Sequence, residues 1–386
     1  MRAHARLRFL LPVATTALMA VPAYAAVPVS STNEPAVTVG GKLLAGKGYV
    51  AARGTGVPAA PTVSALSYVV ADLDTGDVLA ARNPHGRFAP ASTLKSLTAL
   101  TLIDKLDPAG TVTATWDDAN VDGSKVGVQP GKRYVIGKLF EAMLMVSGND
   151  AALTLATANG GVPKTVSEMR AKAQEIGALD TVPLTPNGLD AKGQVSSAYD
   201  LAVIAKHGLA IPAFADYVKE RRSTFGAIGA KPFEIYTHNK LVLRYPGAFG
   251  VKNGYTVAAR ASFVGAAERG GHRLIVSLMH ADPLVWKDAA KLLDWGFAYR
   301  DRLGSVGTLD VVGDLSNDFH ATVETNTSTE HRSSPKVTTN AKRSSFSVPV
   351  APMGAAGLVI AGFVLLRTTA TRRRRGSGGR LKLPPI

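Results

Sequence analysis

The chain has 386 residues, with 44 Lys and Arg against 29 Asp and Glu, and no Cys. This length suits one large domain or two ordinary ones, and the hydrophobic content of 46% excludes a wholly disordered chain. Without Cys, the chain has no disulfide, no thiolate nucleophile, no Cys-ligated zinc and no iron–sulfur cluster.

The excess of positive charge lies at the two ends of the chain. Residues 1–25 hold three basic residues and no acid, and residues 367–386 hold seven basic residues and no acid. The rest of the chain carries 34 bases against 29 acids. A nucleic-acid-binding protein would carry its charge on a folded face, so this distribution predicts membrane topology and no nucleic-acid partner.

The first 25 residues have the pattern of a secretory signal peptide. Arg2, Arg6 and Arg8 form a basic start, residues 9–21 are largely apolar, and Ala23-Tyr24-Ala25 places small residues at a cleavage site. We expect a signal peptide over residues 1–25, cleaved after Ala25; an uncleaved anchor is the alternative. Residues 26–61 are rich in Val, Pro, Gly and Ala and predict an N-terminal linker.

The C-terminal end has the pattern of a membrane anchor. Residues 311–345 are rich in Ser, Thr, Asn and Lys and predict a disordered tether. Residues 346–366 carry no charge, and as a helix they would span about 30 Å, the thickness of a hydrocarbon core. The basic residues of 367–386 follow at once and predict a cytoplasmic tail. We therefore expect a single-pass protein of the cell membrane with an extracytoplasmic body; a hydrophobic tail docked on that body is the alternative.

Residues 62–310 are left as one folded domain. Residues 67–72 and 78–81 predict two strands, joined into a hairpin by the turn residues of Asp74-Thr75-Gly76-Asp77. A helix is expected from Ser92 to about Leu106, with Ser92 as its candidate N-cap residue.

The later part of the domain changes from helices to strands. Helices are expected over residues 135–146, 150–157, 166–176, 198–206 and 286–298, and strands over 249–255, 261–266 and 273–279. Most of the helices lie between early and late strands and do not alternate with them. This order predicts an α+β fold.

Ser92-Thr93-Leu94-Lys95 is the first motif with chemical potential. Residues i and i+3 lie on one face of a helix, so Lys95 can reach Ser92. An amine that shares the proton can activate the hydroxyl as a nucleophile. Taken alone, the motif is better explained by a capped helix with a surface lysine.

Ser147-Gly148-Asn149 is the second motif, and it interrupts two apolar helical stretches. A hydroxyl and an amide held on such a turn can relay a proton and bind a substrate amide. Taken by itself, the motif is better explained by an ordinary turn between helices.

Lys252-Asn253-Gly254-Tyr255-Thr256 is the third motif, and it falls on a predicted strand. Gly254 would let a ligand backbone approach closely, and Lys252 supplies positive charge for a carboxylate. A strand end with an exposed lysine is the alternative.

The three motifs in this order resemble the motif set of the penicillin-interacting serine enzymes. Over about residues 62–300 the chain resembles the low-molecular-mass D-alanyl-D-alanine carboxypeptidases, most of all the membrane-anchored actinobacterial type. Pro186-Asn187-Gly188-Leu189-Asp190 and Ser197-Ala198-Tyr199-Asp200-Leu201 also look like that family. The resemblance implies a β-lactamase-like and penicillin-binding-protein-like transpeptidase fold. In that fold, an antiparallel sheet is flanked by helices and joined by a helical lobe.

The resemblance also implies a mechanism and a partner. Ser92 would attack the bond between two D-alanines of a peptidoglycan stem peptide and form an acyl-enzyme, with Lys95 as the base. Ser147 would pass a proton to the leaving amine. The implied substrate-binding residues are Asn149, Lys252, Asn253, Gly254, Tyr255 and Thr256. The N–H groups of Ser92 and Tyr255 would form an oxyanion hole. β-Lactam antibiotics would act as covalent inhibitors, and no metal or cofactor is needed.

Asn253 departs from the family pattern, which usually reads Lys-Thr-Gly. An asparagine amide donates a hydrogen bond but does not copy the geometry of a threonine hydroxyl. The lost contact would cost roughly 1–3 kcal/mol, unless Thr256 compensates. A weakened or inactive binder of penicillin or peptidoglycan is therefore the main alternative. A serine β-lactamase is less favoured, because no Glu-x-x-Leu-Asn pattern follows the second motif.

Two other patterns are weaker. Residues 41–48 nearly fit a phosphate-binding loop but lack its final Ser or Thr. The eight His residues show no His-Glu-x-x-His spacing, and His238 and His280 are expected to be structural.

Overall fold

The computed structural model describes residues 38–310. The segments 1–25, 311–345, 346–366 and 367–386, predicted as signal peptide, tether, transmembrane helix and tail, lie outside the described residues. Within residues 38–310, no single helix is long and apolar enough to cross a membrane. Two helices, Ala198–Leu209 and Pro212–Lys219, meet that measure only as a pair bent by 109°.

The described elements follow the expected order of strands, helices, strands and a last helix. They are η1 (Lys42–Ala45), β1 (Tyr49–Ala51), β2 (Ser67–Asp72), β3 (Val78–Arg82), η2 (Ala91–Leu94), α1 (Lys95–Leu102), β4 (Thr111–Thr113), α2 (Trp116–Ala119), β5 (Arg133–Val135), α3 (Ile136–Met145), α4 (Asn149–Ala158), α5 (Val162–Glu175), α6 (Ala198–Leu209), α7 (Pro212–Lys219), β6 (Arg222–Phe225), β7 (Phe233–Tyr236), α8 (Lys240–Arg244), β8 (Ala248–Thr256), β9 (Arg260–Arg269), β10 (His272–Ala281), α9 (Val285–Tyr299) and η3 (Arg300–Arg302).

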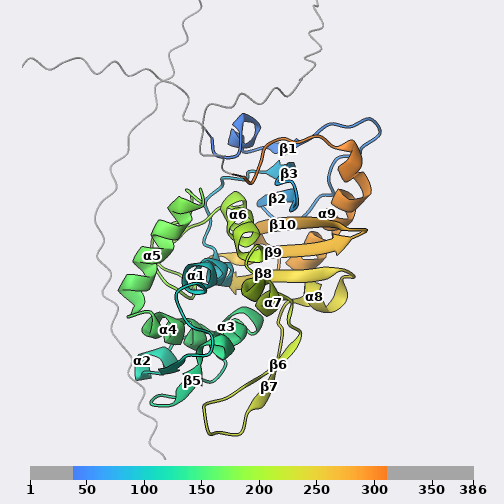
Figure 1. The fold of residues 1–386 in the computed structure, drawn as a ribbon. Coiled ribbons are helices and arrows are strands. Elements are labelled where there is room, and N and C mark those ends of the chain that lie inside the picture. The colour runs from blue at the N-terminus through green and yellow to red at the C-terminus, as the bar shows by residue number, and fades with distance from the viewer. Residues whose placement is uncertain (1–37, 311–386) are drawn as a thin grey trace, which may run out of the picture. The chain divides into compact units, whose positions relative to one another are not determined.

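A six-stranded sheet forms the centre of the described residues (Figure 1). Its strand order is β1-β3-β2-β10-β9-β8, and every neighbouring pair is antiparallel. The predicted hairpin of β2 and β3 is present, and β10 pairs with both β2 and β9. The antiparallel sheet with helices confirms the α+β fold. β8 lies at one edge, which leaves one side of that strand open to other groups.

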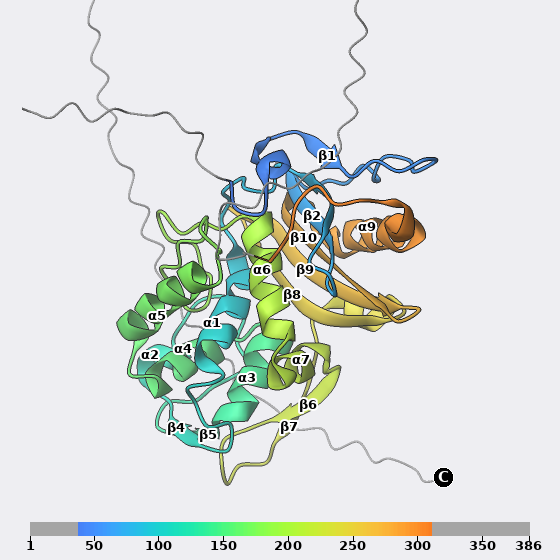
Figure 2. The same ribbon diagram turned by 45° about the horizontal axis from the view of Figure 1, so that its top comes forward.

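Helices cover both faces of the sheet, because its central strands are apolar on both sides. In β2, Val69 belongs to the core shared with α1 and α6, whereas Val70 belongs to the core shared with α8 and α9. Figure 2 shows α9 on one side of the sheet and α1 and α6 on the other. The strands buried on both faces therefore hold the helices in place.

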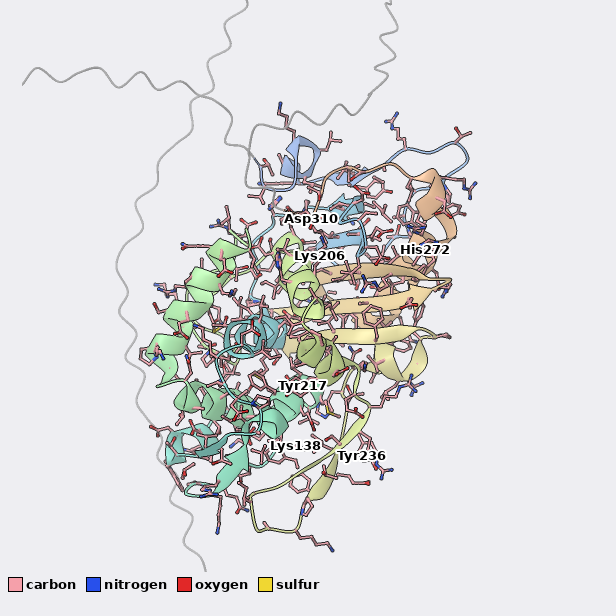
Figure 3. The ribbon with its side chains drawn as sticks, in the orientation of Figure 1. Lys138, Lys206, Tyr217, Tyr236, His272 and Asp310 are labelled. Atoms are coloured by element: carbon pink, nitrogen blue, oxygen red, sulfur yellow. The ribbon has the colours of Figure 1, made fainter. Side chains whose placement is uncertain are left out.

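A helical lobe extends from the first of these faces. It contains α2, α3, α4 and α5 with the short pair β4–β5 (Figure 1). The second small sheet, β6–β7, lies beside α3. There the Nζ of Lys138, labelled in Figure 3, donates to the Oγ of Ser223 at 3.1 Å. Sequence patterns did not predict these small sheets, because their strands have only three or four residues and no clear alternation.

The structure differs from the linker predicted over residues 26–61 in the part that it describes. β1 pairs with β3 and extends the sheet, and Leu44 of η1 is fully buried in the core. The indole N–H of Trp295 donates to the Pro58 carbonyl at 3.0 Å. Single apolar residues thus fix a segment whose composition alone suggested a tether.

The two ends of the described chain meet beside α6. The backbone N–H of Thr308 donates to the Gly40 carbonyl at 2.9 Å, and the Tyr199 hydroxyl donates to the Thr308 carbonyl at 2.7 Å. Lys206 and Asp310, both labelled in Figure 3, form an ion pair at the same place. Hydrogen bonds and an ion pair therefore join the segments near residues 40 and 308 to each other and to α6.

Candidate active site

Ser92 lies in the 3-10 turn η2, directly before α1. The expectation that its side chain caps the helix is wrong, because Pro90 holds the cap position of η2 and no side chain caps either helical start. The preceding residue, Ala91, has a φ of 48°, which is uncommon for a residue other than glycine. Such a conformation costs roughly 1–3 kcal/mol and persists only where neighbouring groups hold it.

The amine of Lys95 contacts the Ser92 hydroxyl. Its Nζ lies 2.8 Å from Ser92 Oγ, 2.7 Å from Asn149 Oδ1 and 2.6 Å from the Asn187 carbonyl oxygen. Lys95 is fully buried. Burial and the positive charge of Lys252 together lower the pKa of Lys95 well below its ordinary value, and Asp150 acts in the opposite direction.

This environment suits a general base. A neutral amine keeps two N–H groups for Asn149 and Asn187 and turns its lone pair toward the Ser92 hydroxyl. A base must lie within hydrogen-bond reach of the proton it takes, and 2.8 Å satisfies that requirement.

The second motif forms the turn between α3 and α4, as predicted. Ser147 is nearly buried and has a φ of 62°, a strained conformation for serine. Asn149 begins α4, and its Nδ2 donates to the Asp122 carbonyl at 2.6 Å while its Oδ1 accepts from Lys95. The amide of Asn149 therefore joins the base to the loop of residues 122–128.

Asp150 holds this loop against α4. Its Oδ1 accepts the N–H of Val126 at 2.9 Å, and its Oδ2 accepts those of Gly127 and Val128 at 2.7 and 2.9 Å. The side chain is fully buried. One carboxylate thus fixes the segment that contacts Asn149.

The third motif lies on β8, at the edge of the sheet. Lys252 is fully buried, and its Nζ donates to the Asn253 carbonyl at 2.8 Å. Burial lowers the pKa of Lys252 to about 7. A Cβ added to Gly254 would lie 2.7 Å from the backbone N of Ser92, so only glycine lets β8 approach the nucleophile this closely.

Tyr255 and Thr256 end the strand on the exposed side. The Tyr255 side chain is 60% exposed. The Thr256 hydroxyl donates to Asp190 Oδ1 at 2.8 Å and accepts from the Ala259 N–H at 3.0 Å. The suggestion that Thr256 replaces the missing threonine hydroxyl meets a difficulty here, because protein groups already engage its oxygen.

The fold brings Ser92, Lys95 and Asn149 into contact and packs Gly254 of β8 against the Ser92 backbone. Of the other residues singled out from the sequence, Ser147 lies in the α3–α4 turn, and Lys252, Asn253, Tyr255 and Thr256 lie on β8. Figure 1 shows α1 end-on, with β8 on one side and α3 and α4 on the other. Sequence reasoning did not assign roles to three residues that hold these groups: Asn187, Asp150 and Ser262, whose hydroxyl donates to the Pro90 carbonyl at 2.6 Å. Asn187 acts through its backbone carbonyl, which leaves no side-chain signal in a sequence.

A second group of titratable side chains lies elsewhere. The ligand atoms of His85, Asp180 and Asp200 are within 4.8 Å of one another. Yet His85 Nδ1 lies 2.8 Å from Asp180 Oδ2, and its Nε2 lies 3.1 Å from the Val39 carbonyl. Both ring nitrogens and the Asp200 carboxylate are therefore already engaged by hydrogen bonds within the protein. A cavity of about 390 Å³ is lined by His85 and its neighbours but not by Ser92.

Solved structures of penicillin-binding DD-peptidases share this fold. A D-alanyl-D-alanine carboxypeptidase from Mycobacterium tuberculosis superposes with a TM-score of 0.63 and 43% identity, covering 66% of this chain and 99% of that one. The DD-transpeptidase of Streptomyces K15 superposes with a TM-score of 0.60 and 25% identity, covering 62% of this chain and 100% of that one. The fold is therefore that of the penicillin-binding DD-peptidases.

Sequence comparison identifies the family within this fold. The family described as D-alanyl-D-alanine carboxypeptidase, peptidase family S11, matches residues 55–283. The carboxypeptidase DacB2 of M. tuberculosis is 44% identical over 256 residues, which cover 64% of this chain and 87% of DacB2. DacF of Bacillus subtilis is 32% identical over 249 residues, 61% of this chain, but the match spans only 62% of DacF. The chain belongs to the D-alanyl-D-alanine carboxypeptidase family and is a hydrolase of that type.

Proposed function

We propose that this chain removes the terminal D-alanine from peptidoglycan stem pentapeptides through an acyl-enzyme on Ser92. The observation that carries the proposal is the buried Lys95 amine, 2.8 Å from the Ser92 hydroxyl. A lysine with a purely structural role would not be expected to lie fully buried against a serine hydroxyl, with the pKa of its own amine lowered.

Acylation requires that a proton be taken from the nucleophile and that a proton be given to the leaving nitrogen. Neutral Lys95 takes the proton from Ser92 as Oγ attacks the carbonyl carbon of the penultimate D-alanine. When the tetrahedral intermediate collapses, the leaving nitrogen must be protonated. Ser147, in the turn between α3 and α4, donates that proton and is reprotonated by the Lys95 ammonium. The terminal D-alanine then leaves as a free amino acid, and its removal leaves an ester on Ser92.

Two backbone N–H groups stabilise the negative oxygen of the intermediate. They belong to Ser92 and Tyr255, and the close approach of Gly254, the residue before Tyr255, to the Ser92 nitrogen supports this pairing. One such donor is worth roughly 3–4 kcal/mol of transition-state stabilisation. Hydrolysis repeats the cycle, with Lys95 taking a proton from water and Ser92 as the leaving group.

Lys252 and Asn253 bind the carboxylate at the C-terminal end of the substrate. The buried Lys252 ammonium supplies charge, and the Asn253 amide supplies a hydrogen bond in place of the usual threonine hydroxyl. A β-lactam presents a similar carboxylate and a reactive amide, so it would acylate Ser92 in the same way. Asn253 then tunes recognition and does not abolish it.

The cellular placement is part of the same proposal. The basic and apolar pattern of residues 1–25 supports secretion, and the uncharged stretch 346–366 with its basic tail supports a single membrane anchor. The catalytic domain would then face the cell wall, where its substrate lies. Protease treatment of spheroplasts tests this directly, because it should digest the domain and leave a protected C-terminal fragment.

The activity test compares the full-length chain with Ser92→Ala in D-alanine release from a pentapeptide stem. We expect release by the native chain only. Labelled penicillin serves as a second readout. Covalent labelling of Ser92 without release would support the alternative of a penicillin-binding protein with weakened catalysis. Release by Ser92→Ala would remove Ser92 from the mechanism.

A further inference from the structure

Ser262 is hydrogen-bonded to the turn of Ser92, where its hydroxyl also accepts the Thr93 hydroxyl at 3.4 Å. This serine of β9 is fully buried, and its hydroxyl donates to the Pro90 carbonyl at 2.6 Å. In the β8–β9 ladder, Ser262 is the direct partner of Gly254, the residue before Tyr255. The Ser262 side chain therefore joins β9 to the turn that carries the Ser92 N–H, and the ladder joins β9 to β8, which carries the Tyr255 N–H.

The conformation of the turn at residues 90–92 must be stabilised by contacts from outside the turn. Ala91 stands between Pro90 and Ser92 with a φ of 48°, so the direction of the Ser92 N–H depends on a strained residue. The Thr93 hydroxyl also donates to the Pro90 carbonyl at 2.6 Å. That bond is local to the turn, because it joins residues three apart, and it does not fix the turn relative to the sheet. Ser262 does so, because it comes from a different element.

Gly254 is packed so tightly that no side chain would fit at its position. A Cβ added there would lie 2.7 Å from Ser262 Oγ and 2.7 Å from the Ser92 nitrogen. The Ser262 hydroxyl and the Ser92 nitrogen therefore both lie close to the Gly254 backbone. A movement of Pro90 away from β9 would move the Ser92 N–H relative to Tyr255.

We propose that Ser262 is a positioning residue that sets the spacing of the two oxyanion donors, the N–H groups of Ser92 and Tyr255. The inference rests on the function proposed above. Ser262 acts through the Pro90 carbonyl and does not touch the substrate. Donors must lie about 2.7–3.1 Å from the developing oxyanion, so their spacing affects the transition state more than substrate binding.

Ser277 provides a matched control. It is a buried serine of the neighbouring strand β10, where it pairs with Val264, two residues along β9 from Ser262. Within the described residues its hydroxyl has no hydrogen-bond partner. Ser277→Ala therefore removes a buried hydroxyl from the same sheet without releasing the turn of Ser92.

The test measures kcat, KM and the rate of acylation by labelled penicillin for Ser262→Ala and Ser277→Ala in the full-length chain. For Ser262→Ala we expect kcat and the acylation rate to fall about 10- to 100-fold, with KM changed by less than about twofold. A peptide boronic acid, whose adduct places an oxygen between the two donors, should lose affinity by a similar factor. For Ser277→Ala all of these values should stay within about twofold of the native chain.

One further variant keeps the inference testable. Ser262→Cys retains a small side chain with a weaker donor, and its acylation rate should lie between those of the native chain and Ser262→Ala. If Ser262→Ala fails to fold, this variant decides the matter alone. Acylation by the Ser262 variants at the rate of Ser277→Ala would overturn the inference. Release of D-alanine by Ser92→Ala would instead overturn the proposed function, so the two failures are distinguishable.

Discussion

Lys95 and Lys252 give the site two buried amines with opposite tasks. In the proposed mechanism Lys95 must be neutral to accept a proton, whereas Lys252 must be charged to hold a carboxylate. Burial lowers the pKa of both. The working range of the enzyme is therefore the interval in which the first amine has lost its proton and the second has kept it.

The pH dependence of kcat/KM follows from these two amines. Activity should rise with pH as Lys95 loses its proton and fall as pH passes about 7, where free Lys252 loses its charge. Arginine keeps its charge at every working pH, so Lys252→Arg should flatten the alkaline fall even if its overall rate is lower. The measurement is kcat/KM for a D-Ala-D-Ala peptide from pH 5 to 10. An alkaline fall that persists unchanged in Lys252→Arg would assign it to another group.

Asn253 stands where the Lys-Thr-Gly pattern implied by the family resemblance has threonine. Asn253→Thr restores the usual hydroxyl beside Lys252, and kcat/KM for a peptide with a free C-terminal carboxylate should rise about tenfold or more. The same peptide with a C-terminal amide is the control, because it lacks the group that the hydroxyl binds, and its rate should change little. Lower activity of Asn253→Thr on the free carboxylate would show that the site is adapted to asparagine.

At the scale of elements, the sequence predicts much of the site because three short motifs fall on elements with strong local signals. The apolar period of α3 and α4 and the break between them place Ser147 and Asn149, and the apolar strand β8 places Lys252. Ser262 carries no such signal, since a serine in a strand is ordinary until the fold brings Pro90 beside it. The 3-10 turn at Ser92 was missed for a related reason: contacts with β8 and β9, and not a side-chain cap, determine its geometry.

Asp150 links the element α4 to the loop that supports Asn149. Asp150→Asn replaces one acceptor oxygen by an NH₂ group that faces backbone N–H donors, and should destabilise the fold by roughly 1–3 kcal/mol. Because the loop also holds Asn149, kcat should fall as well. Asp118→Asn is a suitable control, since Asp118 is a buried carboxylate of α2 bonded to Thr157. That variant should lower Tm without a comparable loss of kcat. Equal losses of kcat in both variants would contradict a specific role for Asp150.

At the scale of the whole molecule, Asp200 makes stability depend on pH. Burial raises the pKa of this carboxyl to about 7, while its oxygen accepts the Thr181 hydroxyl at 2.7 Å. In the unfolded chain the same carboxyl titrates near its ordinary value of about 4. The folded state therefore holds a proton that the unfolded state has lost, and this contribution to stability is lost as pH rises from about 4 toward 7.

Asp200→Asn should remove that loss. The variant should match the native chain near pH 4 and exceed its free energy of unfolding by roughly 2–4 kcal/mol at pH 7.5. Urea unfolding at several pH values provides the measurement. Asp180→Asn gives the opposite sign, because hydrogen bonds from His85 and Arg87 outweigh burial and lower the pKa of Asp180, so this variant should lose stability at neutral pH. Parallel pH curves for the native chain and Asp200→Asn would rule out this source of pH dependence.

The hydrogen bond between residues 308 and 40 brings the two ends of the described chain together, so the domain should tolerate circular permutation. Since the two ends meet at Tyr199, a short glycine linker can join residue 310 to residue 38 without crossing the fold. New termini can then open at Gly229, in the exposed loop between β6 and β7, where an added Cβ would meet nothing within 4 Å. Such a circular permutant should fold and keep its site, because β8, η2 and the α3–α4 turn would meet as before. It would also carry the proposed membrane anchor at a different point on the surface, which would separate the chemistry of the domain from its orientation toward the cell wall.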